Sequence, residues 1–144
     1  MPQDASVTNL ANIASIETLA CDAGWRNYYF VKVTTTDGVT GWSEYDESFG
    51  NPGITSIINQ LRSRIVGRPL GAHEKLHWEL FYALRPGTGG VVGQALGAIE
   101  NALIDAKAKT LGVPCHELLG GKLRDRVQVY WSHCATWRIN RQPH

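Results

Sequence analysis

A two-histidine motif near the middle of the chain is the first place where the residue types point to chemistry. His73 and His77 are four residues apart, with Glu74 between them, in the pattern H-E-x-x-H. On a helix this spacing puts both imidazoles on one face, and in zinc peptidases such a pair binds Zn²⁺ while the glutamate acts as general base. The motif therefore raises the hypothesis of a helical zinc site.

The surroundings of the motif argue against zinc. The extended peptidase motif needs a glycine three residues and a histidine six residues beyond the second histidine, where this chain has Leu80 and Ala83. Glu100 is a plausible third ligand, but Lys75 places a cation between the histidines, where it disfavours a bound metal cation. We therefore predict no metal ligands here and expect a solvated helix face, with Glu74 near the helix N-terminus.

Length and charge restrict the class of protein. The chain has 144 residues, which corresponds to one domain, and its 14 Lys and Arg against 13 Asp and Glu give a net charge of +1. No basic patch or long apolar stretch indicates binding to nucleic acid or a membrane. The three cysteines are far apart, as in a reduced protein, and the N-terminus has no leader pattern. We expect a cytoplasmic protein with small-molecule or protein partners.

Three strands are expected in the first third of the chain. Residues 13–19 alternate weakly, and residues 28–35 are rich in β-branched and aromatic side chains. Asp37 and Gly38 then separate the second strand from residues 39–44, which is a strong hairpin signal. The pattern predicts a small antiparallel meander, which needs a covering layer on one face.

Three helices are expected to supply that layer. Apolar residues at helical spacing predict helices over residues 52–65, 72–84 and 91–111. Gly67 ends the first of these patterns, and Gly112 ends the third. The sequence thus predicts an α+β domain.

The third helix and the third strand carry a family resemblance. Residues 95–109 read ALGAIENALIDAKAK and are followed by Gly112, Pro114 and the LLGG of residues 118–121, while residues 41–44 read GWSE at the end of a strand. In this order, the motifs resemble the signature of the mandelate racemase/muconate lactonizing enzyme family of the enolase superfamily.

The resemblance implies a fold and a division of the chain. It implies an α+β, enolase-like N-terminal domain, in which a three-stranded antiparallel meander packs on a three-helix bundle, followed by the start of a (β/α) barrel. We expect a partly ordered segment at 1–12, a capping domain at 13–121, and a linker with the first barrel strand at 122–144. That strand is expected at 127–132. A whole barrel takes about 200–250 residues, so most of it is absent from these 144.

The family's chemistry belongs to the barrel. The resemblance implies abstraction of a proton next to a carboxylate, with Mg²⁺ stabilising the ene-diolate and a Lys or His as base. Its metal ligands and bases lie on later barrel strands, and no residue of this chain matches one of them. We therefore expect magnesium in the parent enzyme, none bound by this chain alone, and no catalytic residue in it.

The resemblance assigns substrate binding to two loops of the capping domain, at 21–27 and 45–53. Their polar side chains fit a small carboxylate with hydroxyl groups, such as an acid sugar, because desolvated hydroxyls need hydrogen-bond partners. Two residues at the end of the first barrel strand lie where barrel active sites are built. The candidate substrate-binding residues are Trp25, Arg26, Asn27, Glu47, Ser48, Ser132 and His133.

Three hypotheses follow, in order of preference. The first is the capping domain of such an enzyme, for example an acid-sugar dehydratase, not catalytic by itself and associating as a homo-oligomer or with a barrel-bearing chain. The second is a non-enzymatic binding or assembly module. The third is the zinc peptidase.

Overall fold

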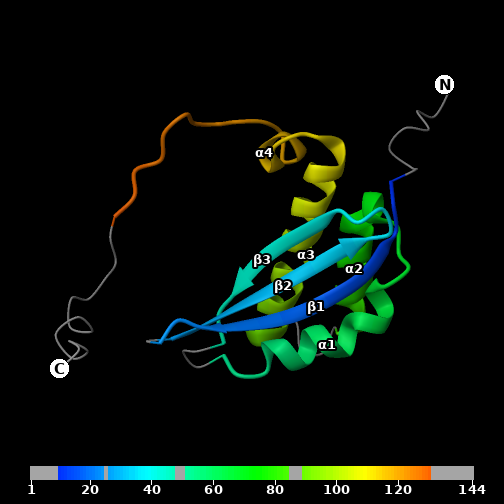
Figure 1. The fold of residues 1–144 in the computed structure, drawn as a ribbon, viewed down its shortest axis with the longest axis vertical. Helices are drawn as coiled ribbons and strands as arrows, with labels where there is room; N and C mark the ends of the chain where they lie inside the picture. Colours follow the sequence, from blue (N-terminus) through cyan, green and yellow to red (C-terminus); the bar gives the residue numbers. More distant parts are fainter. Residues whose placement is uncertain (1–9, 25, 48–50, 85–88, 131–144) are drawn as a thin grey trace.

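The computed structural model describes residues 10–24, 26–47, 51–84 and 89–130, and its elements follow the expected order (Figure 1). Three strands come first, then helices. The strands are β1 (Ile13–Asp22), β2 (Asn27–Thr35) and β3 (Thr40–Tyr45). The helices are α1 (Ile54–Ile65), the 3₁₀ turn η1 (Leu70–Ala72), α2 (His73–Ala83), α3 (Gly90–Leu111) and the short α4 (Cys115–Leu118). The prediction of an α+β fold with a meander and three main helices is confirmed.

The three strands form one antiparallel sheet in the order β1-β2-β3. Opposite residues include Ile16 with Val33, and Val33 with Gly41, so these three share one face. Ile16 and Val33 are buried, whereas Lys32 and Trp42, which are also opposite each other, point to the other face. The sheet is therefore apolar toward the helices and polar or aromatic toward solvent, as antiparallel sheets commonly are.

The helices form a second layer behind the sheet in Figure 1. α3 crosses β3 and β2, and α1 lies along β1. The core consists of aliphatic side chains from both layers, and its largest fully buried members are Ile13, Ile16, Val31, Val33, Ile54, Ile58, Leu61, Ile65, Leu70, Leu76, Ile99 and Leu103. Leu10 packs against this core, and Asn12 pairs with Pro69, so the end of the expected loose segment 1–12 is part of the fold.

Two tryptophans lie at the surface of the domain and not in its core. Trp42 is 42% exposed on the outer face of the sheet, and Trp78 is 49% exposed on α2. Trp78 belongs to an aromatic cluster with Phe81 and Tyr82, whose rings lie 5.4 and 6.0 Å from the indole. Trp78 stays exposed because the buried stripe of α2 is narrow and contains only Leu76 and Leu80.

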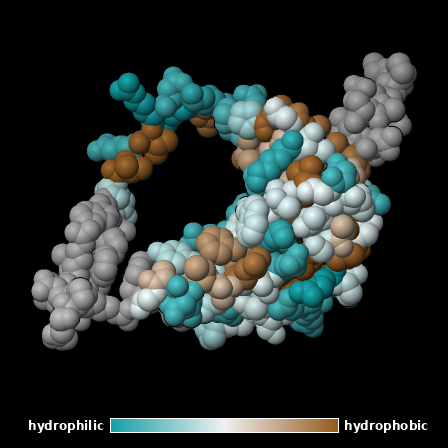
Figure 2. All heavy atoms as spheres, viewed as in Figure 1, coloured by the Kyte–Doolittle hydropathy of each residue, from teal (hydrophilic) through white to brown (hydrophobic). Residues whose placement is uncertain are grey.

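The expected strand at 127–132 is not formed in the described residues. Residues 127–130 have no secondary structure, and residues 131 and 132 lie outside the described part. A strand needs a neighbour to accept its hydrogen bonds, and this segment leads away from the sheet (Figure 1). Figure 2 shows hydrophobic surface on it, which comes from Leu123, Val127 and Val129, each at least 72% exposed. Tyr130, beside them in the sequence, is 87% exposed.

Within the described ranges, no helix combines the length and the apolar composition that crossing a membrane requires.

Candidate functional site

The turn between β1 and β2 holds the first group of candidate residues. The N–H of Gly24 donates to Oδ1 of Asp22 at 2.7 Å, and the N–H of Ala23 donates to the carbonyl of Arg26 at 3.0 Å. Gly24 has φ +80°, a conformation that glycine adopts without strain. Asn27 is exposed at the start of β2, whereas Trp25 lies outside the described residues. The turn therefore presents Arg26 and Asn27 side by side at one end of the sheet.

Arg26 is held by two neighbours. Its guanidinium carbon lies 4.0 Å from the centre of the Tyr28 ring, and Nη2 lies 3.4 Å from Oε1 of Glu44 on β3. The side chain is 26% exposed, so part of the guanidinium stays accessible. An arginine with a stacked ring and an acidic partner is preoriented, which lowers the entropy lost when it binds a carboxylate or hydroxyl.

The second loop starts at the same end of the sheet, because Tyr45 at the end of β3 is opposite Tyr29 near the start of β2. The carboxylate of Glu47 is engaged in hydrogen bonds at the start of α1. Its Oε1 accepts the N–H of Gly53 at 2.6 Å and the N–H of Thr55 at 3.3 Å, and its Oε2 accepts the hydroxyl of Thr55. Sequence reasoning assigns Glu47 to the substrate and does not anticipate these partners at the start of α1.

The other three candidates are not placed. Ser48, Ser132 and His133 lie outside the described residues, so their assignment to the substrate stays a prediction. The structure thus brings together Arg26, Asn27 and the base of the second loop.

The H-E-x-x-H motif lies between α2 and α3. Nδ1 of His73 is 3.3 Å from Nζ of Lys107, which also donates to the carbonyl of Gly71 at 3.0 Å, and Nδ1 of His77 is 3.0 Å from Oε2 of Glu100. Both histidines are only partly exposed, so the expected solvated face is wrong. Both imidazoles face α3, which supplies a charged partner for each: Lys107 for His73 and Glu100 for His77.

These partners also bear on the zinc hypothesis. An ammonium group lies beside one imidazole, and burial followed by the charge of Lys107 lowers the pKa of His73. In the described part of the chain, no three His, Cys, Asp or Glu side chains gather closely enough to hold a metal ion. The described residues likewise do not bring together the oxygen ligands that Mg²⁺ requires.

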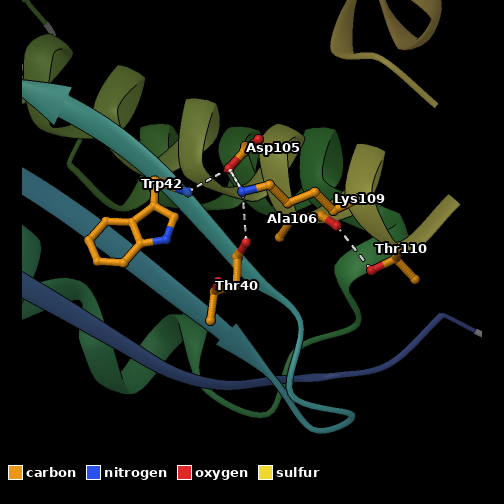
Figure 3. A network of polar contacts seen from close by, with 6 residues as sticks. All are labelled: Thr40, Trp42, Asp105, Ala106, Lys109 and Thr110. Atoms are coloured by element: carbon orange, nitrogen blue, oxygen red, sulfur yellow. Dashed lines mark hydrogen bonds and ion pairs between the residues drawn. The ribbon is translucent and has the colours of Figure 1, made fainter. Parts of the chain in front are cut away.

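The family signature itself holds β3 against α3 (Figure 3). Oδ2 of Asp105 accepts the backbone N–H of Trp42 at 2.8 Å, and Lys109 bridges Oδ2 of Asp105 at 2.6 Å and the carbonyl of Thr40 at 3.1 Å. A Cβ on Gly41 would lie 2.1 Å from the carbonyl oxygen of Ala102, so only glycine permits this approach. Asp105 therefore binds the free edge of the sheet.

Solved structures share this fold. A protein from Burkholderia xenovorans strain LB400, proposed to be an L-alanine-DL-glutamate epimerase and crystallised with magnesium and fumarate, is 64% identical. Its TM-score is 0.85, and the match covers 90% of this chain and 32% of that one. An enolase from Agrobacterium radiobacter, proposed to be a galactarate dehydratase and bound to sodium and L-malate, is 29% identical with a TM-score of 0.75, covering 83% and 30%.

A curated relative gives the same result. The D-galactonate dehydratase of Xanthomonas euvesicatoria is 36% identical over 103 residues, which are 72% of this chain and 27% of the relative. The chain therefore spans about a quarter of the length of the curated relatives it matches.

The meander, the helices behind it and the two loops at one end of the sheet define an N-terminal domain of the enolase superfamily. The chain belongs to the mandelate racemase/muconate lactonizing enzyme family, whose N-terminal domain model matches residues 7–120.

Proposed function

We propose that residues 13–121 are the substrate-capping domain of an enzyme of this family, and that residues 122–144 form a linker and the first strand of its barrel. The observation that carries the proposal is the 64% identity at a TM-score of 0.85 to a protein about three times as long. The family match ends at residue 120, one residue before the proposed boundary.

The reaction proposed for the whole enzyme is Mg²⁺-dependent abstraction of the proton next to a carboxylate. Magnesium would supply charge stabilisation to the developing dianion in the barrel. This chain's share is to bind the end of the substrate remote from the reacting carbon and to exclude water from it. Alone, the chain is expected to have no turnover, because the base and the ligands belong to the barrel.

The proposed substrate is an acid sugar in the cytoplasm. Curated relatives act on D-galactonate, and two solved relatives carry the small carboxylates fumarate and L-malate. Arg26 offers charge-assisted donors and Asn27 both a donor and an acceptor, which is the set that a hydroxylated carboxylate needs. Since the Burkholderia relative is proposed to act on a dipeptide, L-Ala-DL-Glu is the substrate to compare.

The test is a fusion that supplies a barrel. Residues 1–121 of this chain replace the aligned N-terminal domain of the Burkholderia protein, and turnover of D-galactonate, galactarate and L-Ala-DL-Glu is measured with and without Mg²⁺. We expect Mg²⁺-dependent turnover of at least one carboxylate by the fusion, and none by the barrel without a capping domain. A folded fusion that turns over none of them, beside an active parent, would contradict the proposal.

The apolar segment after α4 favours a second candidate, a module for assembly. Leu119, Leu123 and Val129 are 70%, 94% and 84% exposed, and exposed apolar side chains in series promote association. Light scattering of the 144-residue chain and of residues 1–121 separates the candidates. Association that is lost with residues 122–144 supports a homo-oligomer, whereas a monomeric state of both chains excludes self-assembly.

A further inference from the structure

The carboxylate of Glu47 joins the end of β3 to the start of α1. α1 begins after Gly53, which has no side chain to cap the helix, and its first turn contains no acidic residue. The first N–H groups of a helix lack partners within it and attract negative charge. Glu47 supplies a hydrogen-bond acceptor and a negative charge from outside the helix, because its Oε1 accepts the N–H groups of Gly53 and Thr55.

A second chain of hydrogen bonds fixes the other carboxylate oxygen. The hydroxyl of Thr55 donates to Oε2 of Glu47, and the Tyr45 hydroxyl lies 2.7 Å from Oγ1 of Thr55. Since the proton of Thr55 is committed to the carboxylate, Tyr45 is the donor in this pair. Tyr45 is 7% exposed, its ring lies 5.6 Å from that of Tyr29, and burial raises its pKa, so it stays protonated.

These contacts leave Glu47 poorly suited to bind a substrate directly. Three donors already occupy its two oxygens, and an ionised carboxylate would repel the carboxylate of an anionic ligand. Arg26, in contrast, has an accessible guanidinium and the opposite charge. The two residues therefore differ in role although both lie at the same end of the sheet.

We infer that Glu47 is a positioning residue: with Thr55 and Tyr45, it fastens the two ends of the β3–α1 connection to each other and does not contact the substrate. The inference rests on the proposed function for its consequence, since this connection is one of the two proposed substrate loops. It replaces the sequence-based assignment of Glu47 as a substrate ligand.

The fastening is tested in the 144-residue chain by amide hydrogen exchange. Glu47→Ala removes all three acceptor contacts, and we expect exchange at Gly53 and Thr55 to accelerate about fivefold to tenfold, as for the loss of a helix N-cap. Amides in the middle of α3 exchange through global unfolding and report the accompanying loss of global stability. Glu17→Gln, an exposed glutamate on β1, is the control. Unchanged exchange at both amides would overturn the inference.

The role in positioning is tested in the fusion by a comparison of variants. Thr55→Val removes the hydroxyl but leaves the Glu47 carboxylate in place, and Thr55→Ser keeps the hydroxyl. We expect Glu47→Ala and Thr55→Val each to raise KM about fivefold to tenfold with little change in kcat, with a non-additive double variant and near-normal Thr55→Ser.

The outcomes separate the two proposals. If Glu47→Ala raises KM while Thr55→Val does not, Glu47 contacts the substrate and the inference is wrong. If neither variant changes KM in an active fusion, positioning is wrong while the capping function stands. If the fusion is folded but inactive, the capping proposal fails, and the exchange measurement still decides whether Glu47 fastens the connection.

Discussion

The two ends of the sheet are built differently. Where β3 meets α3, the two backbones are in close contact, because Gly41 leaves no room for a methyl group. Asp105 and Lys109 hydrogen-bond to the free edge of β3. At the loop end, side chains make the contacts, through Arg26 with Glu44 and through Glu47 with α1. The difference indicates that the signature residues maintain the scaffold, whereas the exposed pair of Arg26 and Glu44 can change with little cost to folding.

The largest expected effect is at the close contact of β3 with α3. Gly41→Ala would place Cβ 2.1 Å from the carbonyl oxygen of Ala102 and 2.5 Å from the backbone nitrogen of Ala106, so the helix must move away. We expect the free energy of unfolding to fall by about 3 kcal/mol or more, measured by urea denaturation.

Gly97→Ala is the matched control for this prediction. It adds the same methyl group on α3, where nothing lies within 4 Å, and should stabilise the chain by about 0.5–1 kcal/mol. Equal effects of the two substitutions would show that β3 and α3 are not in close contact.

The next effect is at the edge of β3. Asp105→Ala leaves the N–H of Trp42 without its acceptor and Lys109 without its carboxylate, and should cost about 1–2 kcal/mol in thermal or urea unfolding. Asp105→Asn keeps one acceptor and should cost less. Asp125→Ala, at an ion pair whose aspartate is 91% exposed, should change stability by less than about 0.5 kcal/mol. A similar loss for Asp105 and Asp125 would refute the edge contact.

A smaller, pH-dependent effect is expected between α2 and α3. Burial and then Lys107 lower the pKa of His73 from 6.5, so the unfolded chain takes up a proton at this site at higher pH than the folded chain. The contribution to stability is therefore complete above about pH 6.5 and falls as the pH drops below it. Unfolding at pH 8 to pH 5 should show this decline, flatter in His73→Gln and unaltered in His116→Gln. An equally steep decline in His73→Gln would contradict the assignment.

The smallest effect on stability is expected at the loop end. Arg26→Ala removes an ion pair of 3.4 Å whose partner, Glu44, is 53% exposed, and surface pairs of this kind contribute little. We expect a change of about 0.5 kcal/mol or less by urea denaturation. A loss as large as that of Asp105→Ala would show that the two ends of the sheet do not differ as described.

Local sequence signals predict the elements well. The Asp37-Gly38 turn fixes a hairpin whose strands start and end within one residue of expectation, and Gly112, at φ +67°, ends α3 where the sequence places its cap. β1 runs three residues further than its alternation indicates, to Asp22, because pairing with β2 continues to the turn.

The site is less predictable, because its contacts join residues distant in sequence. The bond from Trp42 to Asp105 spans 63 residues, and Glu47 reaches the start of α1 across a loop. The sequence shows both GWSE and the motif that contains Asp105, but nothing local says which backbone group Asp105 meets. The same holds for His73 and His77, whose partners lie on another helix.

We propose that this domain binds the remote end of the substrate, while a barrel supplies the metal ligands and the base. The most direct test of this proposal is the KM of the active fusion for its preferred carboxylate, with and without Arg26→Ala, beside the stability of the same variant of the 144-residue chain. The account predicts a rise in KM of about tenfold or more, since a charge-assisted hydrogen bond is lost, with kcat and stability nearly unchanged. An unchanged KM would contradict it.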